Sequence, residues 1–383
     1  MPVSIPLVFF TIILYRTMNP IQPRSQMKKI FENEKIMNFL TDSYNLSKSE
    51  KTRSLYRTSL NNFNKFCYVK YGKDLLGIID ELKEKQLEDT LDVFLEYKRY
   101  FDNSTTNRRL PLSNSSKTVY MSILKNFFRS CGIKVHHEDI HDHVKIGRKM
   151  RVQKYALGIE NVTTIIEGLG NIPFKTLTIL LASTGMRVME AITLQPTDFD
   201  FESYPISVKI RARETKTNEG RSVYLTNECA IMMEQLIHNK PISQPYLFDK
   251  SVEPLNIYRN YSHALRKALR KIGLYKKLDN GVNQITIHSF RSFFRTYAGH
   301  FIDRDFAESF IGHRFYLSQY QNMPEGEKKK LFLKLEPHIT FNHAPIRATL
   351  SNPDISSLQE QISDLQNKIR ILGQKFLVSE NQA

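Results

Sequence analysis

The apolar residues of this chain recur at the spacing of an α-helix through most of its length, and this periodicity constrains the fold more than any other feature. In the N-terminal third, three apolar stripes predict a small all-helical domain over residues 38–143. Side chains with this spacing normally form the core between packed helices, while polar residues face water. The stripes are Leu55, Leu60, Phe63 and Phe66 or Cys67; Leu87, Leu91, Phe94 and Leu95; and Val119, Ile123, Leu124, Phe127 and Phe128.

One short segment in the second half has the period of a β-strand instead. Residues 206–210 alternate apolar and polar side chains, which is typical of a half-buried strand. A turn at 218–220, followed by apolar residues, predicts the returning strand of a hairpin. Helical spacing before it predicts helices over 159–169 and 174–183. The predicted fold class is mainly α with a small β-hairpin or sheet (α+β), the second domain spanning residues 155–345.

The N-terminal extension, residues 1–37, stands apart from these domains. Its apolar run over 5–15 is shorter than the ~20 residues that a membrane-spanning helix needs, and no basic residue precedes it as in a signal peptide. We expect a dispensable extension with the start codon at Met18 or Met27, and a membrane anchor is the alternative.

The C-terminal segment 354–378 has a heptad pattern. Apolar residues there are separated by alternating steps of three and four, the seam of a coiled coil. We predict a homotypic coiled coil, and the alternative is a lone amphipathic helix that packs back on the body. The apolar positions are 355, 358, 362, 365, 369, 372 and 376.

The charge of the chain indicates a polyanionic partner. Lys and Arg number 55 against 39 Asp and Glu, a formal net charge of +16. Such a surplus serves nucleic acid or an acidic membrane surface. The three cysteines, Cys67, Cys131 and Cys229, are far apart and odd in number, which argues against a disulfide framework and favours the reducing cytoplasm.

Two polar segments join or follow the first domain. Residues 136–143, HHEDIHDH, hold four histidines and three acids without a fixed ligand spacing, so we predict a solvated inter-domain loop and no metal site. A basic linker over 144–154 is expected to lie along a phosphate backbone, with a solvated linker as the alternative. A basic helix near 266–277 is a candidate groove or backbone contact for a nucleic acid. The DNA-binding candidates are Lys145, Arg148, Lys149, Arg151, Lys154, Arg266, Lys267, Arg270 and Lys271.

Two motifs of the second domain place cations where a phosphate could bind. Arg187 begins a predicted helix in STGMRVMEAITL, where the helix N-terminus and a planar guanidinium both favour phosphate oxygens. Lys216 lies in ETKTNEGR, just before the hairpin turn. The glycine motifs that cradle nucleotide phosphates are missing from the sequence, which argues against a nucleotide-driven motor.

Two later motifs add histidines and tyrosines. His288 and Arg291 are three residues apart in HSFRSFFRTYAGH and therefore share one helical face. The segment FIGHRFYLSQY then supplies His313, Tyr316 and Tyr320.

In this order the four motifs resemble the tyrosine recombinase (phage integrase) family over the whole second domain. The helical first domain and basic linker look like the core-binding domain of that family. Tyr320 lies seven residues beyond His313, closer than is usual in the family, and the Tyr-Leu-x-x-Tyr pattern is similar to its archaeal branch. Tyr320 is favoured as nucleophile, with Tyr316 as the alternative. The resemblance implies a catalytic set of Arg187, Lys216, His288, Arg291, His313 and Tyr320.

This resemblance implies a mobile-element integrase that cuts and rejoins double-stranded DNA through a covalent 3′-phosphotyrosine, without ATP, metal or other cofactor. Arginines can neutralise the charge that develops on the phosphate oxygens. A tyrosine hydroxyl, with a pKa near 10, needs help to lose its proton. Four protomers would pair two duplexes. The alternatives are an inactive DNA-binding or synapsis protein on the same fold, and a type IB topoisomerase.

Overall fold

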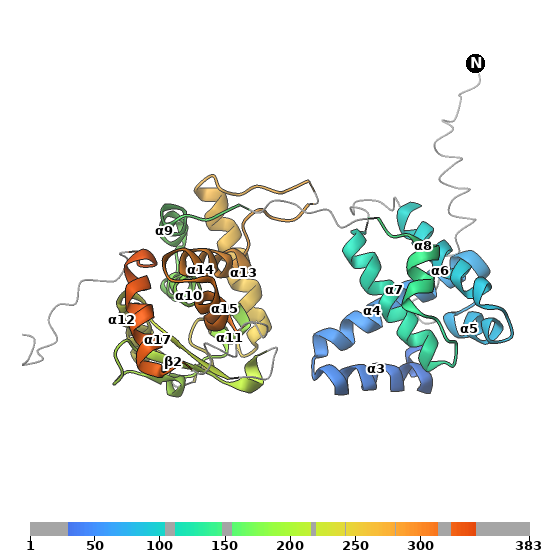
Figure 1. Ribbon diagram of the computed structural model, residues 1–383, viewed down its shortest axis with the longest axis horizontal. Coiled ribbons are helices and arrows are strands. Elements are labelled where there is room, and N and C mark those ends of the chain that lie inside the picture. Colours follow the sequence, from blue (N-terminus) through green and yellow to red (C-terminus); the bar gives the residue numbers. More distant parts are fainter. Residues whose placement is uncertain are drawn as a thin grey trace, which may run out of the picture. The chain divides into compact units, whose positions relative to one another are not determined.

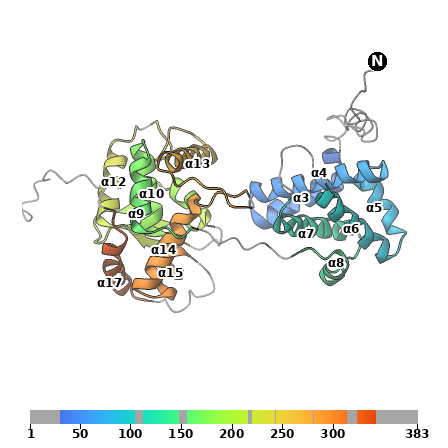
Figure 2. The ribbon, with the colours of Figure 1, turned by 90° about the horizontal axis from the view of Figure 1, so that it is seen from above.

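The computed structural model divides the chain into two compact units, each shown in Figures 1 and 2. The first unit comprises Met1–Gln153 with Leu278–Val282, and the second comprises Lys154–Lys277 with Asn283–Ala383. Residues 1–29, most of the basic linker and the C-terminal heptads lie outside the described residues, so those interpretations and the finer domain limits stay predictions. The last part of the predicted N-terminal extension, residues 30–37, is described, and its Ile30 and Ile36 are buried in the core of the first unit. The structure describes residues 30–103, 112–147, 155–215, 220–241, 243–279, 281–312 and 323–341.

The first unit is built from helices, and α4 packs against both α3 and α7 (Figure 2). Ser49, Asp74 and Ser113 each cap the start of a helix, because their side chains accept a hydrogen bond from a backbone N–H of the first turn. The elements are η1 (Ile30–Glu32), α3 (Glu34–Ser47), α4 (Glu50–Tyr71), α5 (Leu75–Lys83), α6 (Leu87–Asn103), α7 (Asn114–Ser130) and α8 (His137–Val144).

Aromatic side chains fill the centre of the first unit. The ring of Phe63 lies 5.1 Å from that of Tyr97 and 5.8 Å from those of Phe66 and Phe128, in tilted or edge-on arrangements that aromatic pairs prefer. All four side chains are at most 2% exposed. The sequence stripes therefore correctly marked the core of this unit at these helices.

The stripes were wrong at their first positions. Leu55, Leu87 and Val119 are 39%, 41% and 41% exposed. Leu55 precedes the buried Leu60 by five residues, which at ~100° per residue turns it about 140° away from the core face. Leu87 is the first residue of α6, where the chain has only begun to pack.

The histidine-rich segment forms helix α8, so the prediction of a solvated loop was wrong. Ile140 and Val144 are buried, four residues apart on one face, and α8 packs on α6. His143 reaches across to Asp92 of α6, with 3.0 Å between Nε2 and Oδ1. Two apolar residues in a polar segment were enough to bury one helical face. Within the described ranges, no cluster of three potential metal ligands occurs.

The second unit is also mainly helical and contains the small sheet (Figure 1). Its helices and strands are α9 (Ile159–Gly168), α10 (Ile172–Thr184), α11 (Val188–Ile192), η2 (Pro196–Asp198), β1 (Phe199–Asp200), β2 (Ser207–Ile210), η3 (Ala212–Glu214), β3 (Arg221–Tyr224), α12 (Asn227–His238), α13 (Pro254–Lys271), α14 (Ile287–Phe301), α15 (Arg304–Ile311), α17 (Glu325–Leu335) and η5 (Glu336–His338).

The sheet is antiparallel, in the order β1-β2-β3. Val208 of β2 pairs with Val223 of β3 on one side and Phe199 of β1 on the other. These three apolar residues are buried, so one face of the sheet closes on the core. The predicted fold class, mainly α with a small sheet, is confirmed; the two-residue strand β1 was not foreseen.

Helix α10 is the centre of the second unit. Its side chains from Thr176 to Thr184 are all buried, and it packs against α9, α12 and α14. Four of these buried residues are Thr or Ser, and the three threonines each donate a hydrogen bond to a carbonyl of the preceding turn. Helix α14 in turn packs on α15, and Gly185 at the end of α10 lies close to Phe294 of α14 and Ile311 of α15. None of the described helices is long and apolar enough to cross a membrane.

Candidate functional site

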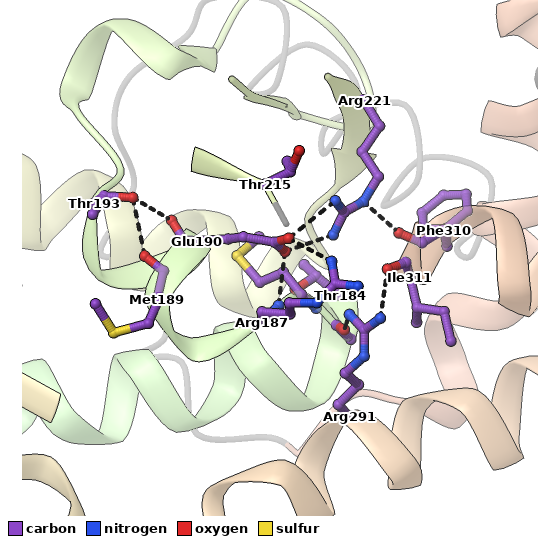
Figure 3. A network of polar contacts seen from close by, with 12 residues as sticks. Thr184, Arg187, Met189, Glu190, Thr193, Thr215, Arg221, Arg291, Phe310 and Ile311 are labelled. Atoms are coloured by element: carbon purple, nitrogen blue, oxygen red, sulfur yellow. Dashed lines mark hydrogen bonds and ion pairs between the residues drawn. The ribbon is translucent and has the colours of Figure 1, made fainter. Parts of the chain in front are cut away.

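The structure brings together two of the predicted catalytic arginines. Arg187 is the N-cap of α11, and Arg291 lies in the first half of α14, one turn beyond His288. Figure 3 shows Arg187 and Arg291 side by side, with the guanidinium groups directed into one polar network. The other predicted residues, Lys216, His313, Tyr316 and Tyr320, lie outside the described residues.

Glu190 holds Arg187 from two directions. The backbone N–H of Arg187 donates to Oε2 and its Nη1 donates to Oε1, both at 2.8 Å. Because Glu190 is the third residue of α11, this arrangement closes the first turn of the helix as a capping residue would. The Glu190 side chain is 1% exposed and that of Arg187 is 27% exposed, so Arg187 keeps a surface open to a ligand.

A third arginine completes the network. Nη2 of Arg221, at the start of β3, lies 2.7 Å from Oε2 of Glu190, and its Nη1 lies 3.4 Å from Oε1. The Nε of Arg221 donates to the Phe310 carbonyl of α15 at 2.9 Å. One carboxylate therefore joins the helix of Arg187 to the sheet, and Arg221 joins the sheet to α15.

Arg291 is held by backbone carbonyls. Its Nη1 donates to the Gly185 carbonyl at 2.7 Å and its Nη2 to the Ile311 carbonyl at 2.6 Å (Figure 3). These carbonyls belong to the C-terminal ends of α10 and α15, where the last carbonyls have no partner within the helix. The residue is 5% exposed. A guanidinium has five N–H donors, so these two bonds leave donors for an anion.

Gly185 lets the end of α10 pack closely against α14 and α15. Its φ is +63°, and an added Cβ would lie 2.5 Å from Phe294 Cδ1 and 2.8 Å from Ile311 Cγ2. Glycine adopts this left-handed conformation without steric cost, and here no side chain would fit. Gly312 has a φ of +73°, and a Cβ there would lie 3.0 Å from Nη1 of Arg221. Both glycines thus let backbone pack directly against the arginine cluster.

The electrostatics of the cluster favour an anion. Burial raises the pKa of Glu190, but hydrogen bonds from Arg221 and Arg187 outweigh it and hold the pKa below its ordinary value. Burial, and then the nearby Arg187, lower the pKa of Arg291 to about 9. Both groups are therefore charged at neutral pH. Three guanidinium groups around one carboxylate leave an excess of positive charge, which a phosphate would neutralise.

Arg221 borders two of the segments that carry the remaining predicted residues, because residues 216–219 end shortly before it and Gly312, which packs against it, precedes residue 313. Thr215, which is 5% exposed, directly precedes Lys216 and lies near Glu190 in Figure 3. Gly312, beside Arg221, directly precedes His313. His288 is described and exposed at the start of α14. These positions leave the roles of Lys216, His288 and His313 as predictions.

The basic residues predicted to bind DNA lie partly on α13. Ile257, Tyr261, Leu265 and other apolar residues bury one face of this helix. Lys267, Arg270 and Lys271 are exposed, whereas Nε of the half-buried Arg266 donates to the Ser262 carbonyl at 3.1 Å. Lys145 is exposed at the end of α8. Arg148, Lys149, Arg151 and Lys154 lie outside the described residues.

The sequence interpretation missed Glu190 and Arg221. Glu190 could have been found, because an acidic residue at the third position of a helix is a capping signal and a buried-face acid is unusual. Arg221 is one of many arginines in a basic chain, and no local pattern distinguishes it from a solvated strand residue.

Comparison with known proteins agrees with this site. Residues 158–317 match the model of the phage integrase family. No curated relative matches the sequence. Residues 158–317 contain Arg187, Arg221 and Arg291, and they belong to the phage integrase family, the tyrosine recombinases. Tyr320 lies just beyond the matched range.

Solved structures similar to the chain are recombinases with low sequence identity. A lambda integrase tetramer bound to a Holliday junction is 15% identical, with 81% of this chain and 88% of that chain covered and a TM-score of 0.48. The XerH recombinase bound to its difH substrate is 16% identical, covering 76% and 92%, with a TM-score of 0.45. The XerA recombinase is 17% identical, covering 79% and 98%, with a TM-score of 0.35. The family assignment rests on the sequence match over 158–317.

Proposed function

We propose that the protein is a site-specific DNA recombinase that cuts and rejoins DNA through a covalent 3′-phosphotyrosine. The observation that carries this proposal is the pair Arg187 and Arg291, held beside each other by Glu190 and by the carbonyls of Gly185 and Ile311. A scissile phosphate seated on this pair would have both non-bridging oxygens neutralised. Preorganised cations of this kind stabilise a transition state because they need not reorganise as charge develops.

The reaction would balance without an external energy source. The Tyr320 hydroxyl gives up its proton to a neighbouring base and its oxygen attacks phosphorus. The bond from phosphorus to the 5′ oxygen breaks, and the leaving 5′ oxygen takes up a proton, so the number of protons is unchanged. His288 and His313 would assist the hydroxyl or a phosphate oxygen, and Lys216 would protonate the leaving oxygen. The phosphodiester bond energy is kept in the phosphotyrosine, so a 5′ hydroxyl can later reverse the step. No cofactor or ATP is required.

DNA binding would use basic residues of both units. Lys267, Arg270 and Lys271 present an exposed basic face of α13, and Lys145 adds a charge beside the linker. Contacts of this kind to phosphates give affinity with strong salt dependence but no base specificity. Exchange of two duplexes requires four cleavages, so four protomers would act together, each supplying one tyrosine. DNA as substrate and unpaired cysteines suit the cytoplasm.

The experiment is capture of the covalent adduct. Wild-type protein would first select its site from a random-sequence library of nicked duplexes, with adducts recovered under denaturing conditions. On the selected duplex, Tyr320→Phe is expected to abolish the adduct, because phenylalanine has no nucleophilic oxygen. Tyr316→Phe is the matched control and is expected to retain it. An adduct that survives Tyr320→Phe and disappears in Tyr316→Phe would overturn the choice of nucleophile.

A further inference from the structure

We infer that Arg221 is a positioning residue of the strand-cleavage reaction, which it serves by fixing Arg187 through Glu190. The inference rests on the proposed function and deepens it. Neither the chain's predicted catalytic set nor the cationic faces considered above include Arg221. It lies at the start of β3, and its side chain is 12% exposed.

The guanidinium of Arg221 is already committed to protein partners. Nη2 and Nη1 both face the carboxylate of Glu190, and Nε donates to the Phe310 carbonyl. Three of its five N–H donors are engaged in these bonds, and a phosphate could take the N–H groups that face Glu190 only by displacing a buried carboxylate. The side chain is therefore built to hold other groups in place, and Arg187, with its greater exposure, is the one that faces the ligand.

The bidentate contact fixes Glu190 in a single orientation. Oε2 of Glu190 accepts from both Nη2 of Arg221 and the backbone N–H of Arg187, while Oε1 accepts from Nη1 of Arg187. With Arg221 in place, the carboxylate plane cannot rotate without breaking a charge-assisted bond at about 2.7–2.8 Å. The direction in which Arg187 presents its guanidinium is thereby set by Arg221.

Arg221 also links this pair to the end of α15. The Phe310 carbonyl accepts from Arg221, and the next carbonyl, of Ile311, accepts from Arg291. Two adjacent carbonyls thus hold two arginines, one from the sheet and one from α14. Gly312 then packs against the guanidinium of Arg221, where a Cβ would lie 3.1 Å from Cζ. This geometry keeps Arg187 and Arg291 in a fixed spacing.

The test compares two substrates that differ only in the charge of the scissile group. One is the duplex that wild-type protein selects, and the other carries a methylphosphonate at the cleaved position, which has one non-bridging oxygen fewer and no negative charge. Arg221→Lys keeps the charge but cannot keep the bidentate fork. Arg211→Lys is the matched control, since Arg211 follows β2 of the same hairpin, pairs with the buried Asp198 at 3.3 Å and donates to the Thr193 carbonyl. Among the described residues, its partners do not include the Glu190 carboxylate or the other two arginines of the site.

We expect Arg221→Lys to form adduct on the phosphate duplex about tenfold more slowly than wild type, with DNA affinity changed by less than about twofold. On the methylphosphonate duplex the loss is expected to shrink to about twofold, because there is less charge for Arg187 to neutralise. Arg211→Lys is expected to show equal, small changes on both. If Arg221→Lys only loosened the fold, it would slow adduct formation equally on the phosphate and methylphosphonate duplexes, and it would lower the melting temperature.

Equal losses on the two substrates, or no loss at all, would overturn the role of Arg221. Arg221→Gln is the second variant, expected to exceed the loss of Arg221→Lys on phosphate and again to recover on methylphosphonate. Wild-type protein that forms no adduct on any duplex of the library would contradict the proposed function itself, and this outcome is read from the wild-type sample alone.

Discussion

Both units have large buried aromatic side chains, but they differ in buried charge. Among the described residues the first unit buries one charged residue, Lys117, whereas the second buries Glu190, Asp198, Glu228, Arg291 and Glu308. The ion pairs of the first unit, such as Lys98 with Asp102, are partly exposed. Burying a charge costs several kcal/mol unless it is paired and hydrogen-bonded. A fold does not need such groups for stability, and Glu190 and Arg291 belong to the proposed site, so we expect the chemistry in the second unit.

The same contrast holds for the glycines that end helices. Gly72 ends α4 with a φ of +68° and nothing within 4 Å of an added Cβ, whereas Gly185 ends α10 with a φ of +63° in contact with Phe294 and Ile311. Gly72 only allows the chain to turn at the end of α4. Gly185 also gives its carbonyl to Arg291.

The largest expected effect comes from alanine at these glycines. Gly185→Ala is expected to lower the free energy of unfolding of the second unit by about 4 kcal/mol, since a strained φ and overpacking add. Gly72→Ala is expected to cost the first unit about 1 kcal/mol, the left-handed strain alone. Hydrogen exchange during a urea titration, followed in peptides of each unit, measures both. An equal loss of unfolding free energy for Gly185→Ala and Gly72→Ala would contradict this contrast between the two glycines.

The next effect is the pH dependence of the stability that Glu190 gives to the second unit and Asp102 gives to the first. The pKa of Glu190 in the folded chain lies below its usual 4.5, because bonds from Arg221 and Arg187 outweigh burial. The unfolded chain therefore binds the proton more tightly, so this stabilisation is complete above pH 4.5 and is lost as pH falls through the folded-state pKa. Burial also opposes ionisation of Asp102, and bonds from Lys117 and Lys98 hold its pKa low.

Glu190→Gln is expected to destabilise the second unit by about 3 kcal/mol at pH 7, because it leaves buried guanidinium groups without a countercharge. The difference from wild type should narrow as the pH falls towards 3. Asp102→Asn, at a side chain that is 34% exposed, should give a smaller version of the same trend in the first unit. Unfolding curves of each unit from pH 7 to pH 3 measure both losses of stability. A larger loss for Asp102→Asn than for Glu190→Gln would contradict the contrast between the two units.

The smallest expected effect concerns two buried tyrosines. Within the described residues, the Tyr97 hydroxyl of the first unit has no hydrogen-bond partner, whereas the Tyr261 hydroxyl of the second lies 2.7 Å from Thr178 Oγ1. Tyr261→Phe is expected to cost about 1 kcal/mol, and Tyr97→Phe to be neutral or stabilising, because no bond is lost. Urea titrations measure the free energy of unfolding of both variants. A loss of about 1 kcal/mol for Tyr97→Phe would show that its hydroxyl does form a hydrogen bond.

The fold class could be predicted because periodicity records which face of a helix or strand is buried. That information was enough for Leu60, Phe63 and the pair Val208–Val223, which are all buried. It failed for α8, where a polar sequence forms a helix because Ile140 and Val144 are buried against a neighbour and His143 reaches Asp92. The helix there depends on a tertiary contact that no local pattern contains.

The candidate site was predicted only in part, for a related reason. Arg187 and Arg291 stood out by their motifs, and the structure places them together. Glu190 and Arg221 act through contacts between residues 31 apart in the chain, and Arg221 reaches Phe310 across 89 residues. Such partners are fixed by the packing of α11, β3 and α15, which spacing along the sequence does not reveal. The roles of Lys216, His288, His313 and Tyr320 stay predictions.

The central claim is that Tyr320 becomes joined to the 3′ phosphate of cut DNA. The most direct measurement is mass spectrometry of the adduct after digestion with a protease and a nuclease. The account predicts a nucleotide remnant on the hydroxyl of Tyr320, linked through its 3′ phosphate. A remnant on Tyr316 or another residue, a linkage through a 5′ phosphate, or DNA cut without any covalent link would contradict it.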